Sequence, residues 1–272
     1  MQKYFWLIAI SFISSKAIAQ RSIDSLIQAE KNFANTSLVV STKEAFMKFI
    51  DSSGIVYDKG KPVNGLELFT KSERRPGILS WEPEYAEISA GNDFGFTTGP
   101  WKFYQNSLKD NPVARGHFVT VWHLINGEWK FLIDLGINYS LERETMPIKK
   151  VNEEKLKIKD DNLQSLKGTE ERFIQAYANQ GAGAYHSFLS SQSRINYTGF
   201  LPATNAKERN ALLDSLPGNI NYTILGFGIS PAKDLGYVYG TITINDKQDG
   251  YLRIWRREKN GWKIALEVLR FK

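Results

Sequence analysis

Asp58 is the residue whose type and position point most directly to acid–base chemistry. It follows the apolar segment 55–57 and precedes Lys59-Gly60. A carboxyl group enclosed by apolar side chains has a raised pKa and can remove a proton next to a carbonyl group. The alternative, which we favour, is that Asp58 is a turn residue, because aspartate is common at the start of turns.

Other kinds of chemistry are excluded by composition and motifs. The chain has no cysteine, so thiolate catalysis, disulfides and cysteine-bound zinc are excluded. The three histidines, His117, His123 and His186, do not have the spacing of a zinc site. The sequence contains no Gly-rich phosphate loop, no Ser-His-Asp order and no G-x-S-x-G motif. We therefore expect no metal and no cofactor.

The two halves of the chain match each other, which indicates a tandem duplication. The matching positions are 140 residues apart at the start of each copy, 141 apart in the middle and 133 apart at the end. They include Leu26 and Leu166, Glu30 and Glu170, Phe33 and Phe173, Tyr57 and Tyr197, Trp122 and Trp255, Trp129 and Trp262, and Asp134 and Glu267. The change of offset predicts a longer loop in the first copy, around residues 106–116.

The duplication separates residues that the fold needs from residues that a specific function needs. Trp122 and Trp129 recur in the second copy, so we interpret them as residues that the fold needs. Trp81 and Trp101 have no tryptophan counterpart and are candidates to line a pocket. For His123, a surface position is the favoured alternative. The predicted ligand-binding residues are Tyr57, Trp81, Trp101, His123 and Asp134, and the predicted catalytic residue is Asp58.

Charged residues near the strand ends are interpreted as solvated. Strict alternation in segment 129–135 places Asp134 on the side of Lys130, opposite the apolar side chains, and this favours an ion pair or an interface contact over catalysis. The basic run within 253–263 is typical of a solvated strand face. The net charge of +6 is too small to indicate nucleic-acid binding, so we expect no nucleic-acid partner.

Each copy has the pattern of an α+β fold. Leu163, Leu166, Phe173 and Tyr177 follow the period of a helix, and a short second helix is expected near 44–49 and 184–189. The remainder alternates with the period of strands, and Asn126-Gly127 and Asn260-Gly261 predict hairpins. Helices followed by hairpin-linked strands predict that helices pack on one face of a curved antiparallel sheet.

Several of these segments resemble the nuclear transport factor 2-like superfamily, which includes SnoaL-like and ketosteroid-isomerase-like domains. They are the helix and short helix, Ile-Val-Tyr-Asp at 55–58, Thr-Gly-Pro-Trp at 98–101, and segments 116–122, 127–130 and 134–136. The resemblance covers both copies and is closer in the first. It implies two cystatin-like cones, each enclosing an apolar pocket, and two copies that pack as an intramolecular pseudo-dimer.

The resemblance also bears on Asp58. In ketosteroid isomerases an aspartate in a similar context is the general base. The oxyanion-binding tyrosine of that family would lie on the first helix, where this sequence has Phe33 and Ala34, and the second copy has Thr198 in place of Asp58. The resemblance therefore implies an incomplete set of catalytic residues.

The N-terminus predicts export. Lys3 precedes an apolar run at 4–13, and Ala17-Ile18-Ala19 is a signal-peptide cleavage site. The run is too short to span a bilayer, and no later segment is long and apolar enough to do so. We expect residues 1–19 to be a signal peptide, 20–146 the first copy, 147–162 a solvated linker and 163–272 the second copy, in a periplasmic or secreted protein.

The leading hypothesis is an exported protein that is non-enzymatic or of unassigned activity. It would bind a small apolar ligand in a pocket of the first copy or act as an interaction module. The alternative is an isomerase or lyase of the SnoaL or ketosteroid-isomerase type with Asp58 as the general base.

Overall fold

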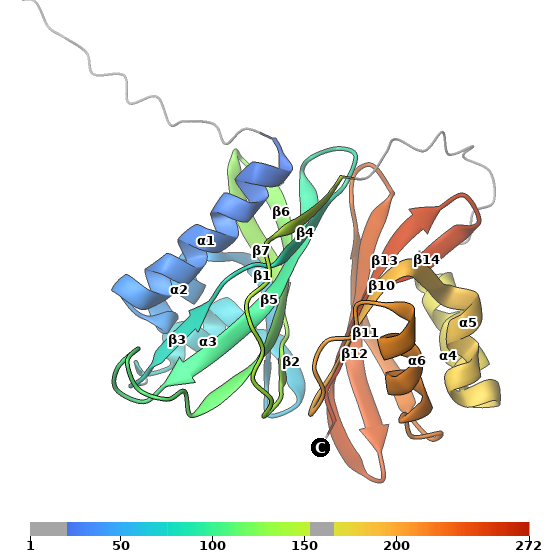
Figure 1. The fold of residues 1–272 in the computed structure, drawn as a ribbon. Helices are drawn as coiled ribbons and strands as arrows, with labels where there is room; N and C mark the ends of the chain where they lie inside the picture. The colour runs from blue at the N-terminus through green and yellow to red at the C-terminus, as the bar shows by residue number, and fades with distance from the viewer. Residues whose placement is uncertain (1–20, 75, 153–165, 272) are drawn as a thin grey trace, which may run out of the picture.

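The computed structural model describes residues 21–74, 76–152 and 166–271. The predicted signal peptide at 1–19, residues 153–162 of the predicted linker and Leu163 lie outside this part of the chain. Within the described residues, no helix is both long and apolar enough to cross a membrane. The fold is α+β, as the sequence predicts, with two cones of helices packed on curved sheets (Figure 1).

The first cone has three helices and nine strands among the described residues. In chain order these are α1 (Ile23–Val39), α2 (Thr42–Phe49), β1 (Ile50–Asp58), β2 (Lys61–Asn64), α3 (Gly65–Lys71), β3 (Ile78–Trp81), β4 (Tyr85–Ile88), β5 (Phe94–Tyr104), β6 (Ala114–Ile125), β7 (Glu128–Asp134), β8 (Ile137–Asn138) and β9 (Lys149–Asn152). The main strand order is β2-β1-β7-β6-β5-β4-β9. Strand β9 lies within the predicted linker, where residues 149–152 pair with β4 in parallel.

The second cone repeats this arrangement with fewer strands. Its elements are α4 (Leu166–Gln180), the 3₁₀ helix η1 (Gly181–Ala184), α5 (Tyr185–Phe188), β10 (Leu189–Tyr197), α6 (Ala206–Asp214), β11 (Asn221–Ile229), β12 (Leu235–Ile244), β13 (Lys247–Glu258) and β14 (Gly261–Leu269). The strand order is β10-β14-β13-β12-β11. A tight turn at Asn245-Asp246, both with positive φ, replaces the loop 105–113 of the first copy, which confirms the predicted difference in loop length.

A β-bulge interrupts the last strand of each cone at the same place. In the first cone Trp122 pairs with Phe131, but Val121 pairs with Ile133, so Leu132 is an extra residue on β7. In the second cone the corresponding extra residue on β14 is Ala265. A bulge reverses the alternation of side chains beyond it. The acids that follow, Asp134 and Glu267, therefore face the interior of their cones.

The two sheets pack against each other through a shared apolar cluster, between the helix layers of the two cones (Figure 1). Its buried members from the first cone are Tyr85, Phe94, Phe96, Val119, Val121, Ile133, Leu135, Ile137 and Tyr139. Those from the second cone are Leu235, Tyr237, Leu252, Ile254, Ala265, Leu266 and Val268. The central strands of each sheet thus bury one face against their own helices and the other against the neighbouring sheet, which is why both faces of these strands carry apolar residues. Strand β11, at the edge of the second sheet, leaves Leu225 and Phe227 exposed.

Buried polar contacts fix the position of one sheet on the other. Arg256 donates to the Glu87 carboxylate at 2.8 and 2.5 Å, and Arg194 donates to Glu84 at 3.2 Å. The Tyr57 hydroxyl reaches the carbonyl oxygens of Gly240 and Tyr251 at 2.8 and 3.0 Å. The expectation that the basic run is a solvated strand face was therefore wrong for its arginines, since Arg253, Arg256 and Arg257 are buried.

Candidate functional site

Two adjoining cavities lie in the first cone. The aromatic cavity has a volume of about 490 Å³ and is lined by Phe33, Phe46, Tyr57, Leu79, Trp81, Trp101, Phe118, Asp134, Gly136, Asn138 and Arg270. The helix cavity, of about 430 Å³, shares Phe46, Tyr57, Leu79, Asp134, Gly136 and Arg270 with it and extends along α2 and α3. Both volumes are in the range of ordinary small-molecule sites. Arg270 comes from the end of the second copy, so both copies contribute to the walls.

The cavities bring most of the predicted site residues together. Tyr57 and Asp134 line both cavities, and Trp81 and Trp101 line the aromatic cavity. His123 lines neither; its Nε2 lies 2.9 Å from the Asp51 carboxylate, and its side chain is 24% exposed. The prediction of His123 as a ligand-binding residue therefore gains no support, and the surface alternative describes its position.

Asp58 lies in the wall of the helix cavity and is half-buried. It also ends strand β1 immediately before Lys59 and Gly60, both of which have positive φ, so it occupies the turn position that the sequence suggests. The position that the resemblance assigns to an oxyanion donor is Phe33, which has no hydroxyl group. The Tyr57 hydroxyl donates to backbone carbonyls of the second cone and is not directed at Asp58.

Asp134 faces the cavities rather than solvent, which corrects the face predicted by strict alternation. The bulge at Leu132 turns it inward, where Thr120 donates to its carboxylate at 2.7 Å. Burial raises the pKa of Asp134 to about 6, against the opposing effect of the Thr120 hydrogen bond. An acid with such a pKa can be neutral or charged near neutral pH, depending on what occupies the cavity.

Glu30 is a second buried acid in this cone, and sequence reasoning assigned it no role. It lies on α1 and accepts hydrogen bonds from Trp81 at 2.6 Å, Thr97 at 2.5 Å and Trp122 at 3.1 Å. Burial raises its pKa to about 7, although the hydrogen bonds from Thr97 and Trp81 lower it. The signal that could have identified it was the recurrence of glutamate at 30 and 170 on an otherwise apolar helix face.

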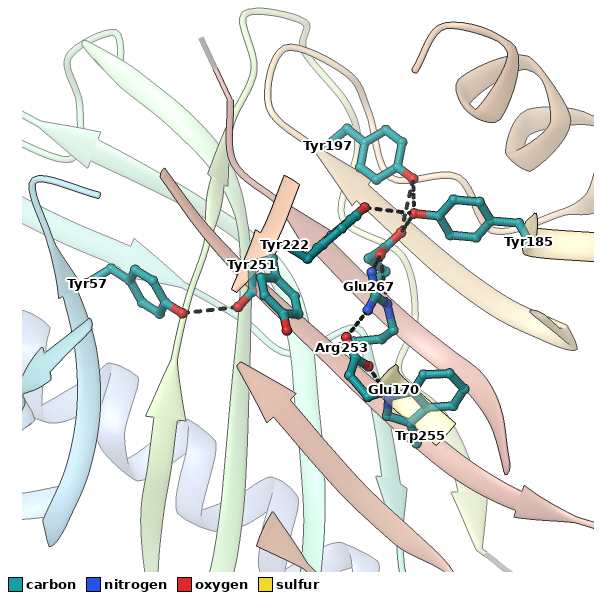
Figure 2. A network of polar contacts seen from close by, with 9 residues as sticks. All are labelled: Tyr57, Glu170, Tyr185, Tyr197, Tyr222, Tyr251, Arg253, Trp255 and Glu267. Atoms are coloured by element: carbon teal, nitrogen blue, oxygen red, sulfur yellow. Dashed lines mark hydrogen bonds and ion pairs between the residues drawn. The ribbon is translucent and has the colours of Figure 1, made fainter. Parts of the chain in front are cut away.

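The second cone has the same two acids, but an arginine lies between them. Arg253 is fully buried, forms an ion pair with Glu170 and donates to Glu267 from Nε at 2.9 Å (Figure 2). Tyr185 and Tyr197 also donate to Glu267, at 2.7 and 3.0 Å (Figure 2). This network occupies the position in the second cone that corresponds to the aromatic cavity of the first. A cavity of about 560 Å³ beside the second sheet is lined by Ile242, Ile244 and Phe271 among others, but Arg253 and its partners do not line it.

The register of the two sheets allows the two cones to be compared residue by residue. Thr120 pairs with Asp134 across β6 and β7, and Arg253 pairs with Glu267 across β13 and β14. Trp122 donates to Glu30 just as Trp255 donates to Glu170, at 3.1 and 2.8 Å. The two cones therefore share a pair of acids and a tryptophan donor. The short Thr120 side chain in place of Arg253 leaves space near the aromatic cavity that the arginine takes up in the second cone.

The Glu30 carboxyl group predicts a pH dependence of stability. Its pKa is raised from 4.5 to about 7 in the folded protein, so the folded state binds more protons than the unfolded state between these values. The contribution of Glu30 to the free energy of unfolding is fully present below pH 4.5 and is lost as the pH rises through 7. The loss is about 3 kcal/mol. We expect Glu30→Gln to raise the melting temperature relative to wild type at pH 8 and to leave it nearly unchanged at pH 4.5.

The matched control is Glu170→Gln, because Glu170 has the counterpart position but is paired with Arg253. Burial raises the pKa of Glu170 as well, against the opposing effect of Arg253. Because the substitution removes one partner of a buried ion pair, we expect it to lower the melting temperature at pH 8. If both variants shift the melting temperature in the same direction, the proposed difference between the two acids is wrong.

The structure offers no metal centre in the part of the chain that it describes, where no group of three or more His, Asp and Glu side chains has a suitable arrangement. His117 is fully buried beside Glu84, with its Nε2 3.4 Å from the carboxylate. Burial and the nearby Arg194 and Arg143 hold the pKa of His117 well below 6.5. His117 is therefore a neutral side chain at the junction of the two sheets.

Comparisons with known proteins concern the fold alone. No protein-family model matches the chain, and no curated protein sequence does. Solved structures with a similar fold include a ketosteroid isomerase-like protein from Erwinia carotovora, at 15% identity over 41% of this chain and 97% of that chain, with a TM-score of 0.33. Nuclear transport factor 2 from Cryptosporidium parvum has 15% identity over 39% of this chain and 90% of its own, with a TM-score of 0.33.

A nuclear transport factor 2-like protein of unknown function from Shewanella oneidensis has 20% identity over 42% of this chain and 96% of its own, with a TM-score of 0.33. The structural neighbours are thus nuclear transport factor 2-like and ketosteroid isomerase-like proteins, each of which covers about two fifths of the chain.

Proposed function

We propose that the protein is exported and binds a small molecule with a large apolar part in the adjoining cavities of its first copy, without catalysing a reaction on it. The observation that carries the proposal is the contrast at corresponding positions of the cones: the first has a cavity lined by aromatic side chains, and the second has a buried polar network around Arg253. The second copy then acts as a support that contributes Arg270 to the cavity wall.

The proposal has two finer parts, which are export and the pairing of the two copies. Export is supported by the apolar run at 4–13 and the Ala17-Ile18-Ala19 cleavage site, and the exported protein would begin at Gln20. We also propose that the two copies act as an intramolecular pseudo-dimer, because the apolar faces of their sheets cover each other.

The binding proposal is tested by thermal shift with a panel of apolar small molecules. A ligand at a hundredfold excess over its dissociation constant stabilises the folded state by about 2.7 kcal/mol, which raises the melting temperature by roughly 5–10 °C in a protein of this size. We expect Leu79→Trp to reduce the shift strongly, because Leu79 lines both cavities and the larger side chain obstructs them.

Leu108→Trp is the matched control, since Leu108 is 51% exposed in the loop 105–113. It should leave the ligand-induced shift intact. A panel without any stabilising compound would contradict the proposal, as would a shift that Leu79→Trp does not reduce.

The alternative function is an isomerase or lyase with Asp58 as the general base. The observation in its favour is that Asp58 lines the helix cavity. Turnover of a ketosteroid-type substrate that is lost in Asp58→Ala would establish this alternative and overturn the non-catalytic proposal.

A further inference from the structure

The guanidinium group of Arg253 shows what the interior of such a cone can hold. It lies over the rings of Phe173, Tyr222 and Tyr251, at 4.1, 5.0 and 5.2 Å from their centroids. Glu170 and Glu267 neutralise its charge (Figure 2). Aromatic faces and carboxylates together stabilise a cation that has lost its water.

The first cone has the same surroundings without the arginine. By the offsets that relate the two copies, Phe33, Trp81 and Phe118 correspond to the three rings around Arg253, and all three line the aromatic cavity. Asp134, the counterpart of Glu267, lines it too. Glu30, the counterpart of Glu170, lies directly behind Trp81, to which it is hydrogen-bonded. Thr120 stands where Arg253 would be.

We propose that the aromatic cavity binds the positively charged head group of an organic cation, a guanidinium or ammonium group on an apolar body. This inference rests on the binding function proposed above and specifies its ligand. The internal arginine of the second cone is a covalently attached counterpart of that head group. Trp81 replaces Tyr222 in the first cone, and tryptophan offers a cation the most favourable aromatic face.

The charges around the cavity agree with this choice. Arg270 is the basic residue in the wall of the aromatic cavity, and it lies 3.2 Å from the Asp249 carboxylate, with its side chain 29% exposed. Lys43, in the wall of the helix cavity, donates to the Ser72 carbonyl. Asp134 accepts from Thr120 and, among the described residues, forms no ion pair. The uncompensated charge in the wall of the aromatic cavity, which Lys43 does not line, is therefore negative once Asp134 ionises.

The test uses three probes of similar shape and different charge: phenylguanidinium, neutral phenylurea and anionic benzoate. Their binding to the purified protein is measured by isothermal titration calorimetry at pH 8, where Asp134 is ionised. We expect phenylguanidinium to bind roughly tenfold or more tightly than either of the other probes, since charge-assisted pairing exceeds a neutral hydrogen bond in strength. Equal or tighter binding of phenylurea or benzoate overturns the inference.

Asp134→Asn should remove the preference for the cation and retain the weaker binding of phenylurea. Its matched control is Asp110→Asn, which neutralises an exposed acid in the loop 105–113 that lines neither cavity and should leave the preference intact. Thr120→Arg should place a guanidinium group in the first cone and abolish binding of phenylguanidinium. A cation preference that survives both Asp134→Asn and Thr120→Arg also overturns the inference.

The outcomes separate this inference from the function on which it rests. If Leu79→Trp blocks neutral apolar ligands and phenylguanidinium has no advantage, the cavity binds ligands but the cationic class is wrong. If neither the apolar panel nor the three probes bind, the binding function itself fails.

Discussion

Arg253→Met is expected to lower the free energy of unfolding by about 3–5 kcal/mol, the usual cost of removing one partner from a buried ion pair. Arg253 is fully buried, and its guanidinium is the cationic partner of both Glu170 and Glu267. Methionine approximates the length of the arginine stem but leaves two carboxylates facing each other in an apolar interior. The Trp255, Tyr185 and Tyr197 donors remain but carry no charge.

The deficit of Arg253→Met should depend on pH. Without the arginine, burial and mutual repulsion disfavour the ionised forms of the two acids in the folded state. The variant therefore loses stability as the pH rises above the unfolded pKa of glutamate, and its deficit is larger at pH 8 than at pH 5. Urea unfolding at the two pH values measures this difference, and adding Glu267→Gln should recover part of the loss at pH 8.

Arg270→Met is the matched control, because the pair of Arg270 with Asp249 is partly exposed and contributes little to stability. It should change the free energy of unfolding by less than about 1 kcal/mol. A deficit of Arg253→Met that is independent of pH and unaffected by Glu267→Gln would show that lost packing, rather than unpaired charge, causes the loss.

Leu252→Asp is expected to cost at least about 4 kcal/mol, because it combines the loss of a buried leucine with an unpaired charge in an apolar interface. Leu252 is fully buried on β13, within the cluster that both sheets share. The substitution acts on the contact between the cones and leaves the cone interiors unchanged. We therefore expect the cones to separate before either unfolds, with a larger radius of gyration in small-angle scattering and two unfolding transitions in place of one.

Leu225→Asp provides the comparison with the same change of side chain. Leu225 is 52% exposed on β11, and its substitution should change stability by no more than about 0.5 kcal/mol. Compact scattering and a single transition for Leu252→Asp would contradict the view that this interface joins the two copies.

The fold was largely predictable because the duplication gave the chain an internal comparison. The helices, the Asn126-Gly127 hairpin with positive φ at both residues, and the alternation of Tyr251, Leu252 and Trp255 all follow from local patterns. Strand β9 was missed because it pairs in parallel with β4, and a four-residue edge strand rich in lysine has no local signal that separates it from a linker.

The site was only partly predictable, and the failures have physical causes. A bulge adds a residue without a marked change of sequence, so the alternation that placed Asp134 toward solvent failed at Leu132. Arg253 looked like a surface charge because its partners, Glu170 and Glu267, are distant in sequence. Burial of such a network is decided by the packing of several elements, which no single segment encodes.

Tyr57 connects the cavities of the first cone with the contact between the two cones. Its ring lines both cavities, while its hydroxyl is bonded to Gly240 and Tyr251 of the second cone, and Arg270 closes the same wall from the other copy. A ligand that contacts these two side chains is in thermodynamic linkage with the docking of the cones. By reciprocity, occupancy strengthens docking by the same factor by which docking strengthens affinity. Ligand saturation would then hold the two copies together as a single cooperative unit.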